Sequence, residues 1–151
     1  MESVHPLAGD QLAAFPTGQD GRPASLLVVE DDPQISDLYK IMLERSGYQV
    51  ALAGDGLEAL ELFRAAQRDG RPYDLVMLDL NLPRMGGLEC LRHLSRIDHG
   101  IRVLVASGSP GLDFQDLSSW VAGVVQKPVR MNTLLEQVDR ALALPRPPAP
   151  A

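Results

Sequence analysis

Five short apolar runs recur along the chain, and longer segments separate them. The runs occupy residues 25–30, 48–53, 75–78, 101–107 and 121–126. Most of the segments between and after them repeat apolar residues at helical spacing. The exception is residues 108–120, which have Gly, Pro and Ser where a helix favours Ala, Leu and Glu. This alternation predicts an α/β fold: a doubly wound parallel sheet covered by helices on both faces, with right-handed crossovers.

The ends of two helices can be read from their flanking residues. Asp32 before Pro33 is typical of a helix cap and first residue, and Gly47 supplies a stop. Asp55 followed by Glu58 predicts a capping box at the second helix. The apolar positions of the successive helices are Ile35, Leu38, Tyr39, Met42 and Leu43; Ala59, Leu62, Phe63 and Ala66; Gly87, Cys90, Leu91 and Leu94; and Leu134, Leu135, Val138 and Leu142. These positions predict the helix faces that cover the sheet.

The chain has 151 residues, enough for one domain with a substantial core. We expect residues 25–144 to form that domain. Residues 1–24 show no sustained period and are expected to be a flexible leader. Residues 145–151, PRPPAPA, are expected to be an extended Pro/Ala tail, which is either a bare end or the start of a linker.

Composition excludes several classes of protein. No apolar run approaches the roughly eighteen residues that span a bilayer, so we expect no membrane insertion. The net charge of −6 argues against nucleic acid as a direct partner. The single cysteine, Cys90, cannot form an internal disulfide and fits a reducing compartment, which favours a cytoplasmic protein. Its place beside Leu91 and Leu94 predicts a small core residue rather than a nucleophile.

Polar side chains stand where four of the predicted strands end. Glu30 ends the first run and Asp31 and Asp32 follow it, Asp79 follows the third, Ser107 ends the fourth and Lys127 follows the fifth. Doubly wound sheets bind their ligands at the carboxyl ends of the strands, so these groups should converge on one edge. Acids at strand ends also serve as helix caps, as expected for Asp32, and a Lys-Pro pair is often a turn. Their joint occurrence nevertheless favours a site.

Such a set of groups suits phosphoryl chemistry. Carboxylates a few ångströms apart repel each other unless a cation joins them, and oxygen ligands at an exposed edge suit Mg²⁺. An aspartate beside Mg²⁺ can attack phosphorus and form an aspartyl phosphate. Lys127 could neutralise charge on the phosphoryl oxygens, and Ser107 could donate a hydrogen bond to one of them.

The motifs LLVVEDD, LVMLDLNLPRMGG, VLVASG and VVQKPV together resemble those of response-regulator receiver domains. The resemblance extends over residues 25–144. It implies a flavodoxin-like fold whose five parallel strands have the order 2-1-3-4-5. It also implies a protein that takes a phosphoryl group from a histidine kinase, or from small phosphodonors, onto an aspartate with Mg²⁺ bound.

By this resemblance Asp79 is the phosphoacceptor and also a metal ligand. Asp31 is expected to bind Mg²⁺ directly, and Glu30 is expected to act mainly through a bound water. Asn81 is expected to offer its backbone carbonyl to the metal.

The resemblance also assigns Ser107 to the hydroxyl position and Lys127 to the family's lysine, with a cis peptide before Pro128. Two positions depart from the family's pattern. Gly86 replaces the usual acid, so we expect a more flexible loop after the phosphoacceptor. Val124 stands where many receivers carry an aromatic residue that moves on phosphorylation, so the coupling to the surface is expected to be weakened or rebuilt.

The leading hypothesis is a response regulator of a two-component system or phosphorelay, acting as a phosphoacceptor switch rather than as an enzyme, with slow self-phosphorylation and self-dephosphorylation. Its partners would be a histidine kinase or phosphotransfer protein, docking on a surface that includes the first helix, and a downstream protein whose identity the sequence does not give. The sequence does not give the oligomeric state either.

Because the chain begins with Met1, a stand-alone regulator is the simpler expectation, with a receiver excised from a hybrid histidine kinase as an alternative. A phosphate-independent binding module is a second hypothesis, and a phosphohydrolase is a third, disfavoured by Asn81 two residues after Asp79.

Overall fold

A computed structural model describes residues 21–108 and 121–144. The strands of these residues form one parallel five-stranded sheet with the order β2-β1-β3-β4-β5. The strands are β1 (Ser25–Val29), β2 (Gln49–Ala53), β3 (Leu75–Asp79), β4 (Arg102–Ser107) and β5 (Gly123–Gln126). The predicted number of strands, their parallel direction and their order are confirmed.

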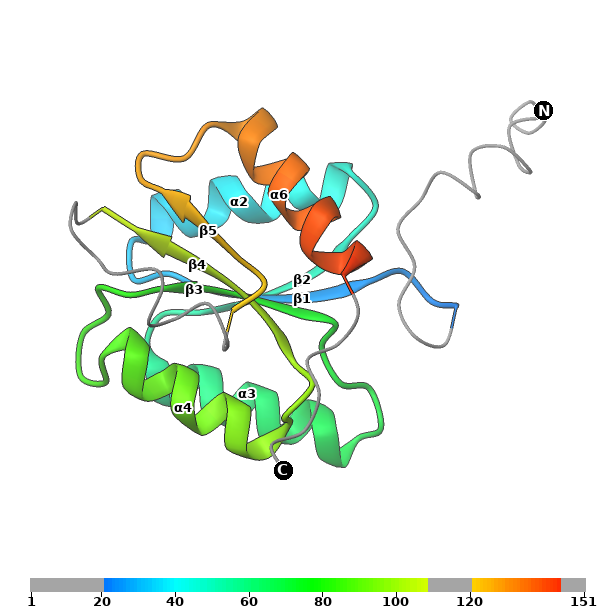
Figure 1. Ribbon diagram of the computed structural model, residues 1–151, viewed down its shortest axis with the longest axis vertical. Helices are drawn as coiled ribbons and strands as arrows, with labels where there is room; N and C mark the ends of the chain where they lie inside the picture. Colours follow the sequence, from blue (N-terminus) through cyan, green and yellow to red (C-terminus); the bar gives the residue numbers. More distant parts are fainter. Residues whose placement is uncertain (1–20, 109–120, 145–151) are drawn as a thin grey trace.

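In the described part of the chain, four helices cover the two faces of this sheet. They are α2 (Pro33–Arg45), α3 (Gly56–Arg68), α4 (Gly87–Ile97) and α6 (Met131–Ala143). Helices α2 and α6 lie on one face, and α3 and α4 lie on the other, as Figure 1 shows. The layers therefore have the doubly wound arrangement predicted from the alternation. The expected leader up to residue 20, the segment 109–120 and the tail 145–151 lie outside the described residues.

The sheet separates two apolar cores. Strand β3 passes between them, and each of its five residues is buried, including Asp79. The core under α3 and α4 contains Leu27, Val29, Phe63, Val76, Leu78, Cys90, Leu91, Leu94, Val103 and Val105. The core under α2 and α6 contains Leu26, Val28, Tyr39, Leu43, Leu75, Met77, Leu104, Leu134 and Val138. Cys90 is fully buried, so the prediction of a core residue is confirmed.

Helix α2 begins and ends where its flanking residues predict. The Asp32 carboxylate accepts hydrogen bonds from the backbone N–H groups of Gln34 (2.9 Å) and Ile35 (3.4 Å). Gly47 follows the helix with φ 97°, a left-handed conformation that favours glycine. These contacts fix the chain as it leaves β1 and as it enters β2.

Helix α3 begins with only half of the predicted capping box. Asp55 accepts a hydrogen bond from Glu58 N at 2.9 Å, as predicted. The Glu58 carboxylate, however, accepts from Gly54 N at 2.6 Å instead of from the N–H of the capping residue. The reciprocal bond is displaced by one residue because the N–H of Gly54 lies within reach of the Glu58 side chain.

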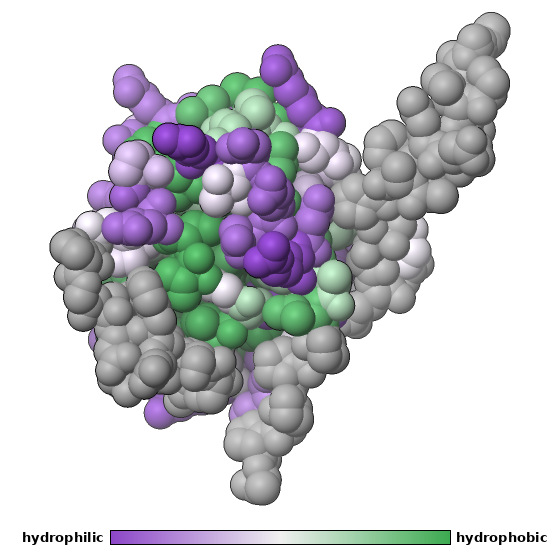
Figure 2. Space-filling model, turned by 45° about the horizontal axis from the view of Figure 1, so that its top comes forward, coloured by the Kyte–Doolittle hydropathy of each residue, from purple (hydrophilic) through white to green (hydrophobic). Residues whose placement is uncertain are grey.

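The apolar face predicted for α2 is wrong at one position. Tyr39 and Leu43 are buried, but the Leu38 side chain is 49 % exposed and Ile41 is 48 % exposed. The buried face is centred on Ser36, Tyr39 and Leu43, and successive helical residues are rotated by about 100°, which turns Leu38 outward. Figure 2 shows apolar areas interrupting the hydrophilic surface on the side where α2 and α6 come forward.

No helix within residues 21–108 or 121–144 is long and apolar enough to cross a membrane.

Candidate functional site

Three carboxylates meet at the carboxyl edge of the sheet. Glu30 follows β1 and Asp79 ends β3, and each is 3 % exposed, whereas Asp31 is exposed to solvent. One carboxylate oxygen from each of the three lies within 4.8 Å of the others. The structure therefore brings together three of the predicted metal ligands.

Lys127 lies against two of these carboxylates. Its ammonium donates to Asp79 Oδ2 at 2.6 Å and to Glu30 Oε1 at 2.8 Å. Burial by itself lowers the pKa of Lys127, but the contacts with Asp79 and then Glu30 outweigh burial and raise this pKa above its usual value. Lys127 is therefore charged at neutral pH and is shared between two strands of the sheet.

The pKa of Glu30 is also raised, but here burial is the cause and Lys127 opposes it. Burial raises the pKa of its carboxyl above the usual value, although the hydrogen bonds from Lys127 Nζ and from Asp32 N (3.1 Å) oppose the shift. The neighbouring charge of Asp79 adds to the increase. The site thus holds three acids for one ammonium, which is more negative charge than Lys127 can neutralise.

This excess of carboxylate oxygen suits a small divalent cation. Mg²⁺ prefers hard oxygen ligands and needs only one or two carboxylates, with waters and a phosphate group completing its coordination. Glu30, Asp31 and Asp79 supply such oxygens at one partly open edge. The donor set therefore fits Mg²⁺.

The loop after β3 brings Asn81 to the same site. Its backbone N–H donates to Asp79 Oδ1 at 2.9 Å, which fixes one oxygen of that carboxylate. The two oxygens of Asp79 therefore have different partners, since the other accepts from Lys127.

Ser107 and Lys127 come from neighbouring strands. Ser107 ends β4, is 2 % exposed and pairs in register with Gln126, and its carbonyl accepts from Lys127 N at 2.8 Å. The peptide bond between Lys127 and Pro128 is cis, as the resemblance implied. The structure thus places each predicted site residue at or next to the carboxyl edge of the sheet.

A glycine holds the following helix close to this edge. A Cβ atom on Gly87 would lie 2.5 Å from Leu80 Cα and 2.7 Å from Asp79 O, so only glycine fits there. At Gly86 a Cβ atom would meet nothing within 4 Å. The sequence predicts Gly87 as the first position of this helix face, but it does not show that Gly87, and not Gly86, is required by space.

Tyr39 lies near the site, but the sequence analysis does not name it as a candidate site residue. Its side chain is buried under α2, and burial, followed by the charge of Glu30, raises the pKa of its hydroxyl. Lys127 opposes this shift and Asp79 adds to it. The sequence signal was a tyrosine at a core position of the first helix, which periodicity alone treats as apolar.

A cavity of about 460 Å³ lies far from the carboxylates, where β1 and β2 begin. Ser25 and Gln49 line it together with Arg22, Arg71 and Asp74. None of the acids at the carboxyl edge contributes to it. This cavity is therefore separate from the carboxylate site.

Comparisons with known proteins agree with this geometry. A family model of the response regulator receiver domain matches residues 26–139. The DNA-binding response regulator MtrA of Mycolicibacterium smegmatis is 37 % identical over 121 residues, which are 78 % of this chain and 50 % of that protein. The probable transcriptional regulatory protein TcrX of Mycobacterium tuberculosis is 36 % identical over 94 residues, 62 % of this chain and 38 % of that protein. The chain thus spans about half or less of the length of these curated relatives.

Solved structures show the same fold. The response regulator protein TrrA of Thermotoga maritima, in a complex with Mg²⁺ and BeF, has a TM-score of 0.67 and 31 % identity. The match covers 78 % of this chain and 98 % of that one. A CheY-like receiver domain protein of Methanospirillum hungatei has a TM-score of 0.68 and 29 % identity, with 79 % of this chain and 93 % of that chain covered.

Proposed function

Because the chain belongs to the response regulator receiver domain family of two-component systems, we propose that it is a phosphoacceptor switch and that Asp79 receives the phosphoryl group. One observation carries the proposal: Asp79 ends a buried strand, yet its carboxylate lies among two other acids and a lysine at the carboxyl edge of the sheet. A buried carboxylate in such a setting is typical of a reacting group.

In the proposed step a carboxylate oxygen of Asp79 attacks phosphorus. The bond from phosphorus to the donor breaks, and its electron pair leaves with the imidazole of a phosphohistidine or with the acetate of acetyl phosphate. Asp79 then carries an acyl phosphate. Asn81 N already holds one oxygen of Asp79, so the carboxylate has a defined orientation before the donor arrives.

Lys127 and Ser107 are proposed to stabilise the transferred group. Lys127 Nζ contacts Asp79 Oδ2 and is positioned to follow the charge that develops on the phosphoryl oxygens. Ser107 lies at the end of the neighbouring strand, and its hydroxyl is proposed to donate to one of those oxygens. Glu30, Asp31 and Asp79, together with the backbone carbonyl of Asn81, would hold Mg²⁺. When bound, the metal would neutralise charge between the carboxylates and the phosphate.

The partner that donates the phosphoryl group is proposed to be a histidine kinase or a phosphotransfer protein. Leu38 and Ile41 supply an exposed apolar strip on α2, the helix that starts directly after Glu30, Asp31 and Asp32. Such a strip next to the site suits a helical partner that presents its histidine to Asp79. We expect the switch to act in the cytoplasm and to signal through a downstream protein.

Mass spectrometry of the intact protein tests the proposal. The protein is incubated with acetyl phosphate and Mg²⁺, beside an Asp79→Asn variant and a sample with EDTA. One phosphoryl group should add to the wild type, and only when metal is present. Failure to add with both acetyl phosphate and a phosphorylated kinase would remove the phosphoacceptor function and favour the phosphate-independent binding module. Steady turnover of a phosphate ester, far above self-dephosphorylation, would instead favour a phosphohydrolase.

A further inference from the structure

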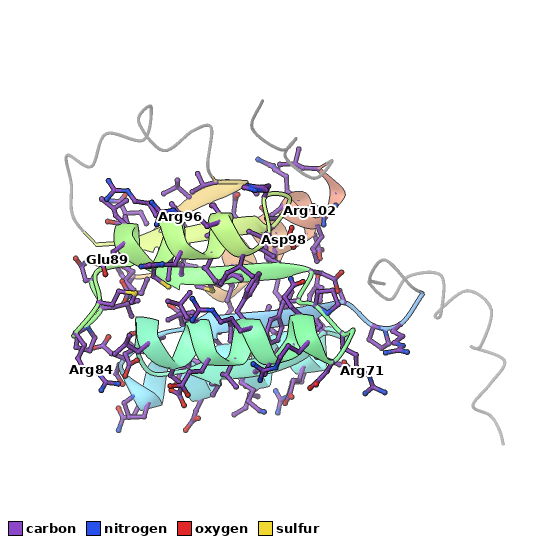
Figure 3. The ribbon with its side chains drawn as sticks, turned by 90° about the horizontal axis from the view of Figure 1, so that it is seen from below. Arg71, Arg84, Glu89, Arg96, Asp98 and Arg102 are labelled. Carbon is purple, nitrogen blue, oxygen red and sulfur yellow. The ribbon has the colours of Figure 1, made fainter. Side chains whose placement is uncertain are left out.

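The loop between β3 and α4 is tied to a part of the chain remote in sequence. Arg84 Nη2 of this loop forms an ion pair with Asp55 Oδ2, the cap of α3. Figure 3 shows Arg84 beside the start of α3, at the end opposite to Arg71. The pair therefore joins the loop that follows Asp79 to the loop that follows β2.

The backbone at Arg84 indicates that this position is under constraint. Arg84 has φ 67° and is the one non-glycine residue with a positive φ in the described part of the chain. An L-residue rarely adopts this conformation without compensation, and an observed outlier of this kind is a guide to function. From this backbone conformation the Arg84 side chain reaches Asp55.

The Asp55 carboxylate is held in place and ionised before it contacts Arg84. Its side chain is 15 % exposed, whereas that of Arg84 is 62 % exposed. The hydrogen bond from Glu58 N, followed by the contact with Arg84, holds the pKa of the Asp55 carboxyl below its usual value. Asp55 is thus an ionised group fixed at a helix end, and Arg84 is the more exposed partner.

The neighbouring residue strengthens the same attachment. Met85 is buried and packs on Gly56, where a Cβ atom would lie 3.0 Å from Met85 Cβ and 3.1 Å from its Sδ. At its other end the loop binds the site directly, through Asn81 N and Asp79 Oδ1 at 2.9 Å. The attachment to α3 and the contact with Asp79 therefore lie within one short loop.

We propose that Asp55 and Arg84 are positioning residues for the phosphorylation site: their ion pair holds the β3–α4 loop so that Asn81 stays beside Asp79. This inference rests on the proposed function of Asp79. The pair supplies an anchor in a loop where Gly86 has no Cβ atom and no side-chain cap contact for α4.

Two charge-removing variants and their combination test the inference. Asp55→Asn keeps an oxygen that can accept from Glu58 N, and Arg84→Asn suits the positive φ, so each removes the ion pair while the local backbone remains favoured. The control is Glu44→Gln, which removes an exposed ion pair with Lys40 on α2. The readouts are the Kd of Mg²⁺ from NMR titration, the hydrogen exchange of the Asn81 amide without metal, and the rate of phosphoryl uptake from acetyl phosphate.

Each single variant should weaken Mg²⁺ binding about threefold or more and speed exchange of the Asn81 amide by a similar factor. The double variant should bind Mg²⁺ no more weakly than the single variant with the lower affinity, because both substitutions remove the same contact. The control should match the wild type. Unchanged Kd and unchanged Asn81 exchange in both single variants would overturn the inference, as would independent, additive effects.

The outcome also separates this inference from the proposed function. If the wild type takes up no phosphoryl group but the variants lose Mg²⁺ affinity or Asn81 protection, the phosphoacceptor function fails and the positioning role stands. If the wild type is phosphorylated and the variants match it in every readout, the positioning role alone fails.

Discussion

Lys127 Nζ lies 2.6 Å from Asp79 Oδ2, so the ammonium contacts the carboxylate that we propose as the phosphoryl acceptor. The same ammonium contacts Glu30, and both acids are buried. Lys127 is therefore the main source of positive charge for the two carboxylates before a cation arrives.

Replacing Lys127 with methionine should lower the free energy of unfolding at pH 7 by about 1–3 kcal/mol, because two buried carboxylates lose their cation. Added Mg²⁺ should restore more stability to this variant than to the wild type. Urea denaturation with and without Mg²⁺ measures both effects. Lys40→Met is the matched control, since Lys40 is 3.5 Å from Glu44 on an exposed helix surface and should change stability little. Equal effects in the two variants would contradict the prediction.

Replacing Glu30 with glutamine should stabilise the metal-free protein at neutral pH. Burial raises the pKa of Glu30 above its usual value near 4.5, so the folded state binds this proton more tightly and ionisation weakens folding. The variant should gain about 1 kcal/mol at pH 7, the ordinary size of a stabilising substitution. The gain should vanish at a pH below the usual range of the carboxyl, where Glu30 is protonated in both states. Denaturation across this pH range checks the sign, and a variant less stable than wild type at pH 7 would contradict it.

Asp55 should show the opposite pH dependence. Its pKa is lowered in the folded protein, so the unfolded chain binds the proton more tightly and ionised Asp55 stabilises the fold. This contribution is present above the usual pKa of the carboxyl and is lost as the pH falls through the folded-state value. The stability difference between wild type and Asp55→Asn should therefore shrink in acid. A difference that stays constant from pH 7 to strongly acidic conditions would show that the charge is not the cause.

Replacing Gly87 with alanine should disturb β3 and α4 together. The added Cβ atom would lie 2.5 Å from Leu80 Cα, and backbone cannot move aside as a side chain can. We expect a loss of about 1–3 kcal/mol, the usual effect of overpacking. Gly86→Ala is the matched control, because nothing lies within 4 Å of its added atom and only a poorer helix cap, worth about 0.5 kcal/mol, is expected. Thermal unfolding of the pair measures the difference, and similar losses would refute the steric explanation.

The fold was predictable because its local signals agree with its packing. Asp32 and Gly47 mark the ends of α2 in the sequence, and both act there as predicted. Asp79 interrupts an apolar run, and its burial at the strand end follows from that position. In each case the signal lies within a few residues of the feature that it predicts, so one stretch of sequence is sufficient.

The contacts and the exposure that the sequence does not predict depend on residues distant in the chain. The sequence placed Leu38 on the apolar face, but the direction of α2 against the sheet decides which of its apolar residues point inward. The Asp55–Arg84 ion pair joins residues 29 positions apart. Lys127 was expected to face a phosphoryl group, and its contact with Glu30, 97 positions away, appears only when β1 and β5 have taken their places.

The close approach of Gly87 to Leu80 has a mechanical consequence. There is no free space between the end of β3 and the first turn of α4, so Leu80 cannot shift toward the helix without moving it. Helix α4 has 11 residues. A rigid helix of that length spans roughly 16 Å and transmits a push at one end to the other. A displacement that begins beside Asp79 would therefore move α4 as one rigid body. The movement would reach Ile97 and Asp98 at the far end of the helix, near the opposite edge of the sheet.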